Sequence, residues 1–195
     1  NGNSHGCMVS FPDISPFPNM PVNGPDRRFM AMPAYLGGEY DMAGMKWYGS
    51  NVENKDKGLP RSILMLMLND KETGAPRSLM SANLLSAYRT GAVPGVGAKH
   101  LARRDSKVLG IYGPGVMNKT ALEAFVCTCP CLDTIKIKGR SRGSIESFIE
   151  YVKGKFPQFQ TIEVADTLEE LVRGSDVISM ATSCPEGTEN YPDRK

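Results

Sequence analysis

The sequence has almost no excess charge and no long apolar run. Its 195 residues include 23 lysines and arginines against 21 acidic residues, a net charge of +2. Because affinity for nucleic acids grows with the number of clustered basic contacts, so small an excess argues against a general polyanion binder. The longest aliphatic run, residues 63–68, is far shorter than the roughly 20 residues that a membrane-spanning helix needs. We therefore expect a soluble globular protein with neither a nucleic-acid nor a membrane partner.

Residues that build metal sites are also few. The chain has two histidines, His5 and His100, and five cysteines, of which three lie at alternate positions between 127 and 131. That spacing lacks the Cys-x-x-Cys pattern that places two thiolates on one zinc ion, and neither histidine is near it in sequence. We therefore assign no metal and interpret these cysteines as small apolar residues at a helix end. An odd number of cysteines and the lack of a recognisable signal peptide favour a reducing, cytoplasmic location.

Glycine and proline, by contrast, are abundant and divide the first half into short segments. Residues 1–26 show no regular period and predict an irregular arm. A long helix is expected over 82–103, with a kink at Pro94. Its larger apolar residues on one side are Leu84, Leu85, Tyr88, Ala92 and Val96. Between the arm and the helix, strand-like segments separated by short polar turns indicate an antiparallel or mixed sheet; they are residues 28–33, 40–48, 61–68 and 76–81.

The second half alternates between strands and helices. This alternation is typical of βαβ units, which build a parallel sheet through right-handed crossovers. We therefore predict an α/β chain of two domains: a mixed or antiparallel α+β domain at 1–103, and a partial, apparently truncated Rossmann-type domain at 104–195. The strands expected in the second domain are 107–112, 134–138, 161–164 and 176–180, and the helices are 116–127, 144–155 and 168–172.

A glycine-rich turn follows the first strand of the predicted parallel sheet. Gly113 permits a tight turn, and Gly115 allows the backbone to approach a pyrophosphate. The next residues, Val116 and Met117, begin a helix whose N-terminus attracts anions. Asn118 stands where the dinucleotide fingerprint has its third glycine or alanine. The turn therefore predicts an NAD(P) site in which the cofactor phosphates contact Gly113, Gly115, Val116 and Met117.

The end of the second parallel strand bears on the choice of cofactor. An NAD site usually has an acidic residue there, which binds the ribose 2′-hydroxyl. This chain instead has Arg140, Ser141 and Arg142, which suit a 2′-phosphate, so we favour NADP(H) over NAD(H). The alternative interpretation is a solvated basic loop. The same basic stretch lacks interleaved aromatic residues, which again argues against nucleic-acid binding.

Several separated segments carry a family resemblance. They are residues 32–36, 44–51 with Asn54, 68–74, 88–92 and 113–115. In this order and spacing the chain resembles the ornithine cyclodeaminase/mu-crystallin family over about residues 28–184. The segment 37–46 is similar to the branch that makes diaminopropionate for siderophores, and closer still to sequences named as the second subunit of a tyramine oxidase. That name describes a component of an assembly rather than a mechanism.

The resemblance assigns roles to Lys46 in one motif and to Arg89 and Thr90 in another. Lys46 matches the family lysine that binds the substrate carboxylate near the reacting carbon. Arg89 and Thr90 match an Arg-Thr pair whose arginine bridges the cofactor phosphate and the substrate carboxylate, and a guanidinium suits either oxyanion. The structural alternatives are a strand-edge surface lysine for Lys46 and a helix-surface arginine for Arg89.

Further positions match the family less directly. Arg28, or its neighbour Arg27, is nearest to a second carboxylate-binding arginine of the family, which has no clean counterpart here. Arg61 falls where the family has a cofactor-proximal residue of another type. Ala181 and Thr182 follow the fourth parallel strand, at the edge of the sheet that touches ligand in open α/β folds.

The resemblance implies an NAD(P)-dependent enzyme that acts on the Cα–N bond of a small L-amino acid or its imine. Hydride leaves Cα for the nicotinamide while the substrate carboxylate is clamped. Cyclodeaminases return the hydride to a cyclic imine, whereas dehydrogenases and imine reductases do not, and the motifs leave these outcomes open. An alternative of another class is a non-catalytic protein that binds NADPH and a carboxylate ligand, or an accessory subunit of an amine-oxidising system.

The resemblance also implies a homodimer, formed through the sheet of the first domain. The family's catalytic aspartate follows the fourth strand of the parallel sheet, in a segment that these 195 residues do not contain. We therefore expect the chain to lack both the general base and the final strands of the fold, and to be inactive by itself.

Overall fold

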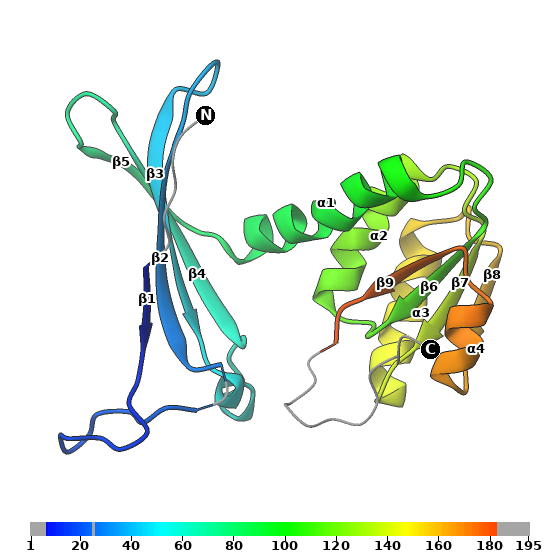
Figure 1. The fold of residues 1–195 in the computed structure, drawn as a ribbon, viewed down its shortest axis with the longest axis horizontal. Coiled ribbons are helices and arrows are strands. Elements are labelled where there is room, and N and C mark those ends of the chain that lie inside the picture. Colours follow the sequence, from blue (N-terminus) through cyan, green and yellow to red (C-terminus); the bar gives the residue numbers. More distant parts are fainter. Residues whose placement is uncertain (1–6, 25, 183–195) are drawn as a thin grey trace. The chain divides into compact units, whose positions relative to one another are not determined.

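The computed structural model describes residues 7–24 and 26–182. The chain forms two compact units, Asn1–Ser86 and Ala87–Lys195, each with its own sheet (Figure 1). The division between functional domains that we predict after residue 103 stays a prediction, because the helix that precedes it begins in one compact unit and ends in the other.

The first unit is a five-stranded antiparallel sheet in which strands adjacent in sequence are also adjacent in space. Its strands are β1 (Cys7–Ser10), β2 (Arg28–Leu36), β3 (Met42–Ser50), β4 (Ser62–Asn69) and β5 (Pro76–Ser81). The antiparallel pairing confirms the predicted sheet. The prediction of an irregular arm is wrong for residues 7–10, because β1 pairs with β2 along its whole length.

A short 3-10 helix, η1 (Val52–Lys57), lies in the connection between β3 and β4. The side chain of Asn51 caps it by accepting a hydrogen bond of 3.0 Å from the N–H of Glu53. The side chain of Asn54 donates to the carbonyl oxygen of Pro60 at 3.1 Å. Both asparagines of the recognised motif therefore shape this connection locally, as side-chain caps commonly do.

The register of the antiparallel sheet separates two faces. Lys46 of β3 lies opposite Met32 of β2 and Leu66 of β4. Directly paired residues share a face, and alternate residues along a strand return to it. We name the Lys46 face after this residue; it also carries Arg28, Met30, Tyr48, Ser50, Ser62 and Leu64. The opposite Trp47 face carries Phe29, Ala31, Met45, Ile63, Met65 and Met67.

Helix α1 (Asn83–Leu101) leaves the first sheet through its first residue. The side chain of Asn83 donates to the carbonyl oxygen of Ser62 at 2.7 Å and accepts from the N–H of Leu64 at 2.8 Å. Both partners belong to β4, so this one amide fixes the start of the helix to the sheet. The helix is continuous through Pro94.

The buried side of α1 consists of small residues. Within the second unit these are Ala87, Gly91, Gly95 and Ala98. A Cβ atom added at Gly95 would lie 2.5 Å from Cβ of Ala124, which belongs to the next helix, so the two backbones approach closely. The larger apolar residues that the sequence places on one side are largely exposed instead: Leu84 at 69%, Leu85 at 51%, Tyr88 at 42% and Val96 at 59%.

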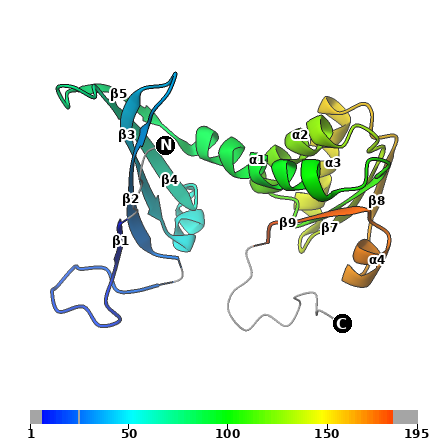
Figure 2. The ribbon, with the colours of Figure 1, turned by 45° about the horizontal axis from the view of Figure 1, so that its top comes forward.

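The second unit contains a four-stranded parallel sheet in the order β8-β7-β6-β9. Counted along the chain this is the order 3-2-1-4, with which a Rossmann sheet begins. The strands are β6 (Val108–Tyr112), β7 (Thr134–Lys138), β8 (Thr161–Val164) and β9 (Val177–Met180), and the helices between them are α2 (Val116–Thr128), α3 (Arg142–Lys155) and α4 (Leu168–Arg173). Figure 2 shows α2 and α3 on one side of this sheet and α4 on the other. The predicted Rossmann-type topology is confirmed.

The core of the second unit lies between its sheet and the helices α2 and α3. Leu109 and Ile135 of the central strands are fully buried with Phe125 of α2 and Phe148 of α3. Burying side chains of this size stabilises a fold by about 1.5–3 kcal/mol each. Across residues 7–24 and 26–182, no helix is both long and apolar enough to cross a membrane.

Candidate functional site

The glycine turn between β6 and α2 has the geometry of a phosphate-binding turn. Gly113 adopts φ = 87°, in the left-handed region, and its N–H donates to the carbonyl oxygen of Lys138 at 2.9 Å. Gly115 precedes α2 without a side-chain cap, and a Cβ atom there would meet nothing within 4 Å. The first N–H groups of a helix have no intrahelical partner. Val116 and Met117 therefore offer backbone donors at an open helix N-terminus.

The carboxyl end of β9 lies against this turn. The N–H of Ala181 donates to the carbonyl oxygen of Tyr112 at 2.9 Å. A Cβ atom at Gly113 would lie 2.4 Å from the carbonyl oxygen of Ala181 and 3.0 Å from a methyl carbon of Thr182. The structure thus brings together the predicted residues of the turn and those that follow the fourth parallel strand.

The basic residues of β7 and of the segment after it make different contacts. Lys136 pairs with Glu163 at 3.1 Å, and Lys138 donates to a backbone carbonyl at 2.5 Å, so both lysines contact neighbouring segments. Ser141 caps α3 by accepting from the N–H of Ser144, and Arg142 pairs with Glu146 at 2.8 Å. Arg140 is exposed, and within the part of the chain that the structure describes it has no ion-pair partner.

Arg89 and Thr90 are exposed residues of α1, in the turn that packs against α2. Two contacts fix this turn: Thr120 donates to the carbonyl oxygen of Ala87 at 3.0 Å, and Gly91 packs directly on Thr120. Since α2 begins at Val116, Thr120 is one turn from the open helix N-terminus. Arg89 and Thr90 therefore belong to the segment of α1 that runs beside the start of α2.

In the first unit, Arg28 and Lys46 lie on the same face of the sheet, on either side of Tyr48. The guanidinium carbon of Arg28 is 5.8 Å, and Nζ of Lys46 is 5.9 Å, from the centre of the Tyr48 ring. Both distances suit cation–π contact. The tyrosine hydroxyl lies 3.0 Å from the hydroxyl of Ser62. Sequence reasoning missed Tyr48 as part of this group, although its spacing of two residues from Lys46 on a strand places both on one face.

Asp26 holds the arginines at the end of the Lys46 face. Its carboxylate pairs with Arg28 at 2.7 Å and with Arg61 at 2.7 Å, and Nε of Arg61 donates to it at 2.8 Å. The hydroxyl of Ser50 donates to its carbonyl oxygen. Arg27, the other candidate for a carboxylate-binding arginine, pairs with Glu53 instead. No sequence signal singled out Asp26, whose partners lie on β2, on β3 and directly before β4.

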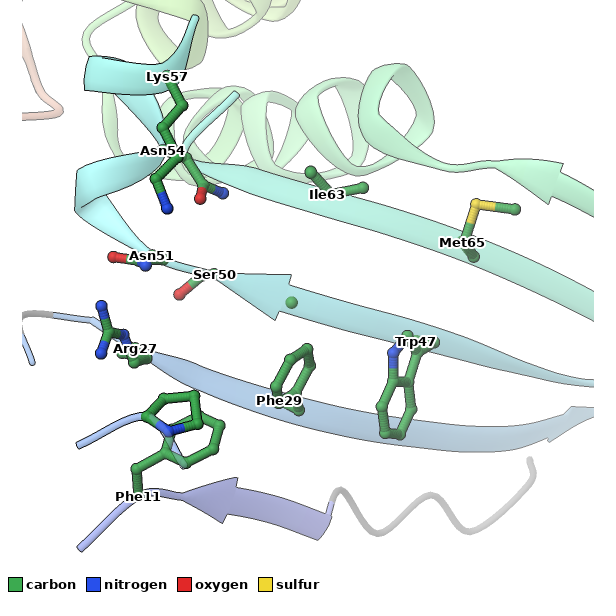
Figure 3. Close-up of a pocket in the computed structure, with 12 residues that line it drawn as sticks. Phe11, Arg27, Phe29, Trp47, Ser50, Asn51, Asn54, Lys57, Ile63 and Met65 are labelled. Carbon is green, nitrogen blue, oxygen red and sulfur yellow. The ribbon is translucent and has the colours of Figure 1, made fainter. Parts of the chain in front are cut away.

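A pocket of about 510 Å³ lies on the opposite, Trp47 face (Figure 3). Phe11, Phe29, Trp47, Ile63 and Met65 form its apolar walls, and Lys57 stands at one end. The rings of Phe29 and Trp47 are stacked, with centres 5.9 Å apart. Arg27, the alternative candidate for a carboxylate-binding arginine, lines the pocket, whereas Arg28 and Lys46 project from the other side of the same sheet.

Three cysteines lie close together in sequence at the end of α2 and directly after it. Cys129 is buried at the end of α2, whereas Cys127 and Cys131 are exposed, and all three are free thiols. Within residues 7–24 and 26–182, no three His, Cys, Asp or Glu side chains are grouped so that they could hold a metal ion. Cys184 lies outside the described residues.

A parallel sheet in 3-2-1-4 order with a glycine turn at a helix N-terminus is the arrangement of the Rossmann fold. The model of the ornithine cyclodeaminase/mu-crystallin family matches residues 1–188. The chain belongs to this family, as the sequence motifs predict.

Two similar curated proteins are dehydrogenases. The N-((2S)-2-amino-2-carboxyethyl)-L-glutamate dehydrogenase of Staphylococcus aureus is 31% identical over 153 residues, covering 78% of this chain and 46% of that protein. The alanine dehydrogenase of Archaeoglobus fulgidus is 46% identical over 94 residues, covering 48% of this chain and 28% of that protein. The chain thus spans about half, or less, of the length of the curated relatives it matches.

Solved structures agree with this assignment. The Δ(1)-pyrroline-2-carboxylate reductase of Thermococcus litoralis, in complex with NADH and L-proline, superposes with a TM-score of 0.70 at 33% identity, over 78% of this chain and 46% of that one. A lysine cyclodeaminase that recognises L-lysine, L-ornithine and L-2,4-diaminobutyric acid superposes with a TM-score of 0.74 at 28% identity, over 99% and 51%. The relatives are therefore dehydrogenases, reductases and cyclodeaminases of small amino acids.

Proposed function

We propose that this chain is the cofactor- and carboxylate-binding part of an NAD(P)-dependent enzyme that acts on the Cα–N bond of a small L-amino acid or its imine. The reaction is an oxidative deamination, an imine reduction or a cyclodeamination. The observation that carries the proposal is the open turn from Gly113 to Met117 at the start of α2. The activities of the similar proteins support it.

The residues present fit a dinucleotide. The uncapped N-terminus of α2 offers the N–H groups of Val116 and Met117 to a pyrophosphate, and the open space at Gly115 lets it approach. Arg89 and Thr90 would add a cation and a hydroxyl from the neighbouring turn of α1. Ala181 and Thr182 line the same edge of the sheet. When bound, the nicotinamide supplies hydride exchange with the substrate.

NADP(H) is the cofactor form that we propose. Arg140 is exposed after β7, beside Ser141 and Arg142, and the strand is not followed by the carboxylate that usually binds a ribose 2′-hydroxyl. An exposed guanidinium is suited to a 2′-phosphate, with which it can form two parallel hydrogen bonds. Relatives of known structure contain NADH or NAD, so the proposal of NADP(H) rests on these residues of the chain alone.

Arg28 and Lys46 are proposed to bind the substrate carboxylate. They project from one face of the sheet, on strands that pair directly, and Tyr48 lies between them. Two cations near one ring repel each other, and a bound carboxylate would offset that repulsion. Asp26 holds Arg28 in place and is itself engaged by two arginines. In this role the chain binds and orients the substrate; the family motif adds Arg89 as a further carboxylate contact.

We also propose a cytoplasmic homodimer that covers the Trp47 face. Phe29, Trp47 and Ile63 are each about two-fifths exposed on that face, which is unusual for a contiguous apolar surface of a monomer.

Ligand titration tests the proposal. We expect saturable binding of NADPH, followed by its fluorescence, and binding of L-proline to the complex with NADP⁺. Lys46→Ala and Arg28→Ala should each weaken L-proline binding by about tenfold or more and leave the NADPH dissociation constant within about twofold. Lys57→Ala, which removes another cation of the same unit, is the matched control and should change neither.

Two results would contradict the proposal. A chain that fails to bind either reduced cofactor has no dinucleotide site, and unchanged L-proline binding in both variants removes the carboxylate clamp. A protein that binds both ligands can still catalyse none of the three reactions. If it neither oxidises an amino acid, reduces an imine nor releases ammonia by cyclodeamination, the non-catalytic binder or accessory subunit replaces the enzyme as the function.

A further inference from the structure

Asn118 is a fully buried polar side chain at the third position of α2. Its Nδ2 donates to the carbonyl oxygen of Gly113 at 2.8 Å and to that of Tyr112 at 3.1 Å, with a longer contact of 3.5 Å to the carbonyl oxygen of Ser179. Its Oδ1 accepts a hydrogen bond of 2.6 Å from the hydroxyl of Ser179. The side chain amide therefore has partners on both its donor and its acceptor side.

Through these partners Asn118 connects three segments at one edge of the parallel sheet. Tyr112 ends β6, Gly113 begins the phosphate-binding turn and Ser179 belongs to β9. The carbonyl oxygen of Gly113 also accepts from the N–H of Gly115 at 2.8 Å, so two donors hold this one oxygen. The two donors also reduce the negative potential of this carbonyl oxygen. This matters because the carbonyl lies beside the N-terminus of α2, where we propose that an anion binds.

The two carbonyl oxygens determine which way the amide of Asn118 points. If the amide were turned over, Oδ1 would face the carbonyl oxygens of Tyr112 and Gly113, and both contacts would become repulsive. In the observed orientation the nearly fully buried hydroxyl of Ser179 donates to Oδ1 and satisfies the acceptor side of the amide.

We propose that Asn118 is a positioning residue for the dinucleotide phosphates, and that Ser179 supports it by satisfying its amide oxygen. In the dinucleotide fingerprint the third glycine or alanine lets helix and strand pack closely. Here a side chain occupies that place and holds the turn through hydrogen bonds instead. The inference rests on the proposed function for the identity of the ligand, but the hold on the turn is a property of the chain itself.

The experiment has two readouts, taken on the whole chain. Hydrogen exchange of the backbone amides at 113–117, without cofactor, reports whether the turn is held, and NADPH titration reports whether the hold serves binding. We expect Asn118→Ala to accelerate exchange in this segment and to raise the NADPH dissociation constant about tenfold. Asn118→Asp should do more, because it places a carboxylate oxygen against two carbonyl oxygens.

Ser179→Ala removes only the hydroxyl that satisfies Oδ1 of Asn118 and should have a smaller effect of the same kind, which keeps the test valid if the Asn118 variants do not fold. Thr128→Val is the matched control: it removes a hydrogen bond of 3.0 Å from the far end of α2 and should alter neither readout. Unchanged exchange in Asn118→Ala and Ser179→Ala would overturn the inference, as would faster exchange with unaltered NADPH affinity. If the unaltered chain binds no cofactor, the proposed function fails, and the exchange data still decide whether Asn118 holds the turn.

Discussion

Gly91 of α1 packs directly against Thr120 of α2. A Cβ atom at Gly91 would lie 2.4 Å from Oγ1 of Thr120 and 2.6 Å from its carbonyl carbon. Backbone atoms cannot move aside as the end of a flexible side chain can, so Gly91→Ala must separate the two helices. We expect a loss of about 1–3 kcal/mol in the free energy of unfolding, measured with urea.

Gly97→Ala, on the same helix, is the control for this variant, since a Cβ atom added at Gly97 would meet no other atom within 4 Å. There alanine should stabilise the chain by up to about 1 kcal/mol, because glycine is the poorer helix former. Equal destabilisation by both variants would show that helix spacing is not the cause.

Asp26→Asn should destabilise the first unit and weaken its carboxylate binding. The variant removes the charge that pairs with Arg28 and Arg61. Because both arginines are partly exposed, solvent offsets part of the loss, and we expect about 1–2 kcal/mol by urea unfolding. Glu53→Gln, which breaks a more exposed pair with Arg27, should cost less than about 1 kcal/mol. A Glu53 variant as unstable as the Asp26 variant would contradict the role of Asp26 as a bridge between two arginines.

The stability of the second unit should depend on pH through Asp176. The backbone N–H groups of Lys107 and Val108 donate to its carboxylate at 2.8 and 3.0 Å, and with Arg103 nearby they hold the pKa of Asp176 below its ordinary value. A depressed carboxyl pKa stabilises the fold above the pKa of the unfolded chain, and this contribution is lost as the pH falls through the lower, folded value.

Asp176→Asn removes that contribution. The variant should be less stable than the unaltered chain at pH 7, and its urea midpoint should fall less steeply between about pH 5 and pH 3. Asp105→Asn removes an exposed carboxylate that is 3.7 Å from the same arginine and should keep the original slope. Parallel pH curves for the chain and its Asp176 variant would exclude the linkage.

Arg140 should distinguish the two reduced cofactors. If its guanidinium contacts a 2′-phosphate, Arg140→Ala raises the NADPH dissociation constant about tenfold and changes that of NADH by less than about twofold. Lys153→Ala, in the last turn of α3, is the charge-matched control. The same loss of affinity for both cofactors would show that Arg140 acts through general electrostatic attraction rather than at the phosphate.

The parallel half of the fold was predictable in detail from the sequence. The predicted strands 134–138 and 161–164 have the bounds of β7 and β8, because short β-branched runs between helices leave few other arrangements. β1 was missed, since its four residues lie in an arm without alternating polarity and gain their order from pairing with β2. Local patterns do not report partners that the fold supplies from elsewhere.

The buried side of α1 could not be predicted from periodicity for a related reason. Large apolar residues dominate such patterns, and they direct attention to Leu84 and Leu85, which are exposed. The contact with α2 instead selects glycine and alanine, because only small residues allow two helix backbones to approach closely. Of the candidate site, the family motifs supplied Lys46 and left Arg27 and Arg28 as the nearest candidates for a second cation, whereas Asp26 became visible only when the sheet placed it beside its arginines.

The two glycines of the turn between β6 and α2 are constrained for different reasons. Gly113 combines φ = 87° with a carbonyl oxygen 2.4 Å from any added Cβ atom, whereas Gly115 has an ordinary φ of −104° and open space. In a library of variants sorted first for folded protein and then for cofactor binding, substitutions of Gly113 should disappear in the first round. Substitutions of Gly115 should survive until the second. We therefore expect Gly113 to be required for folding and Gly115 for cofactor binding.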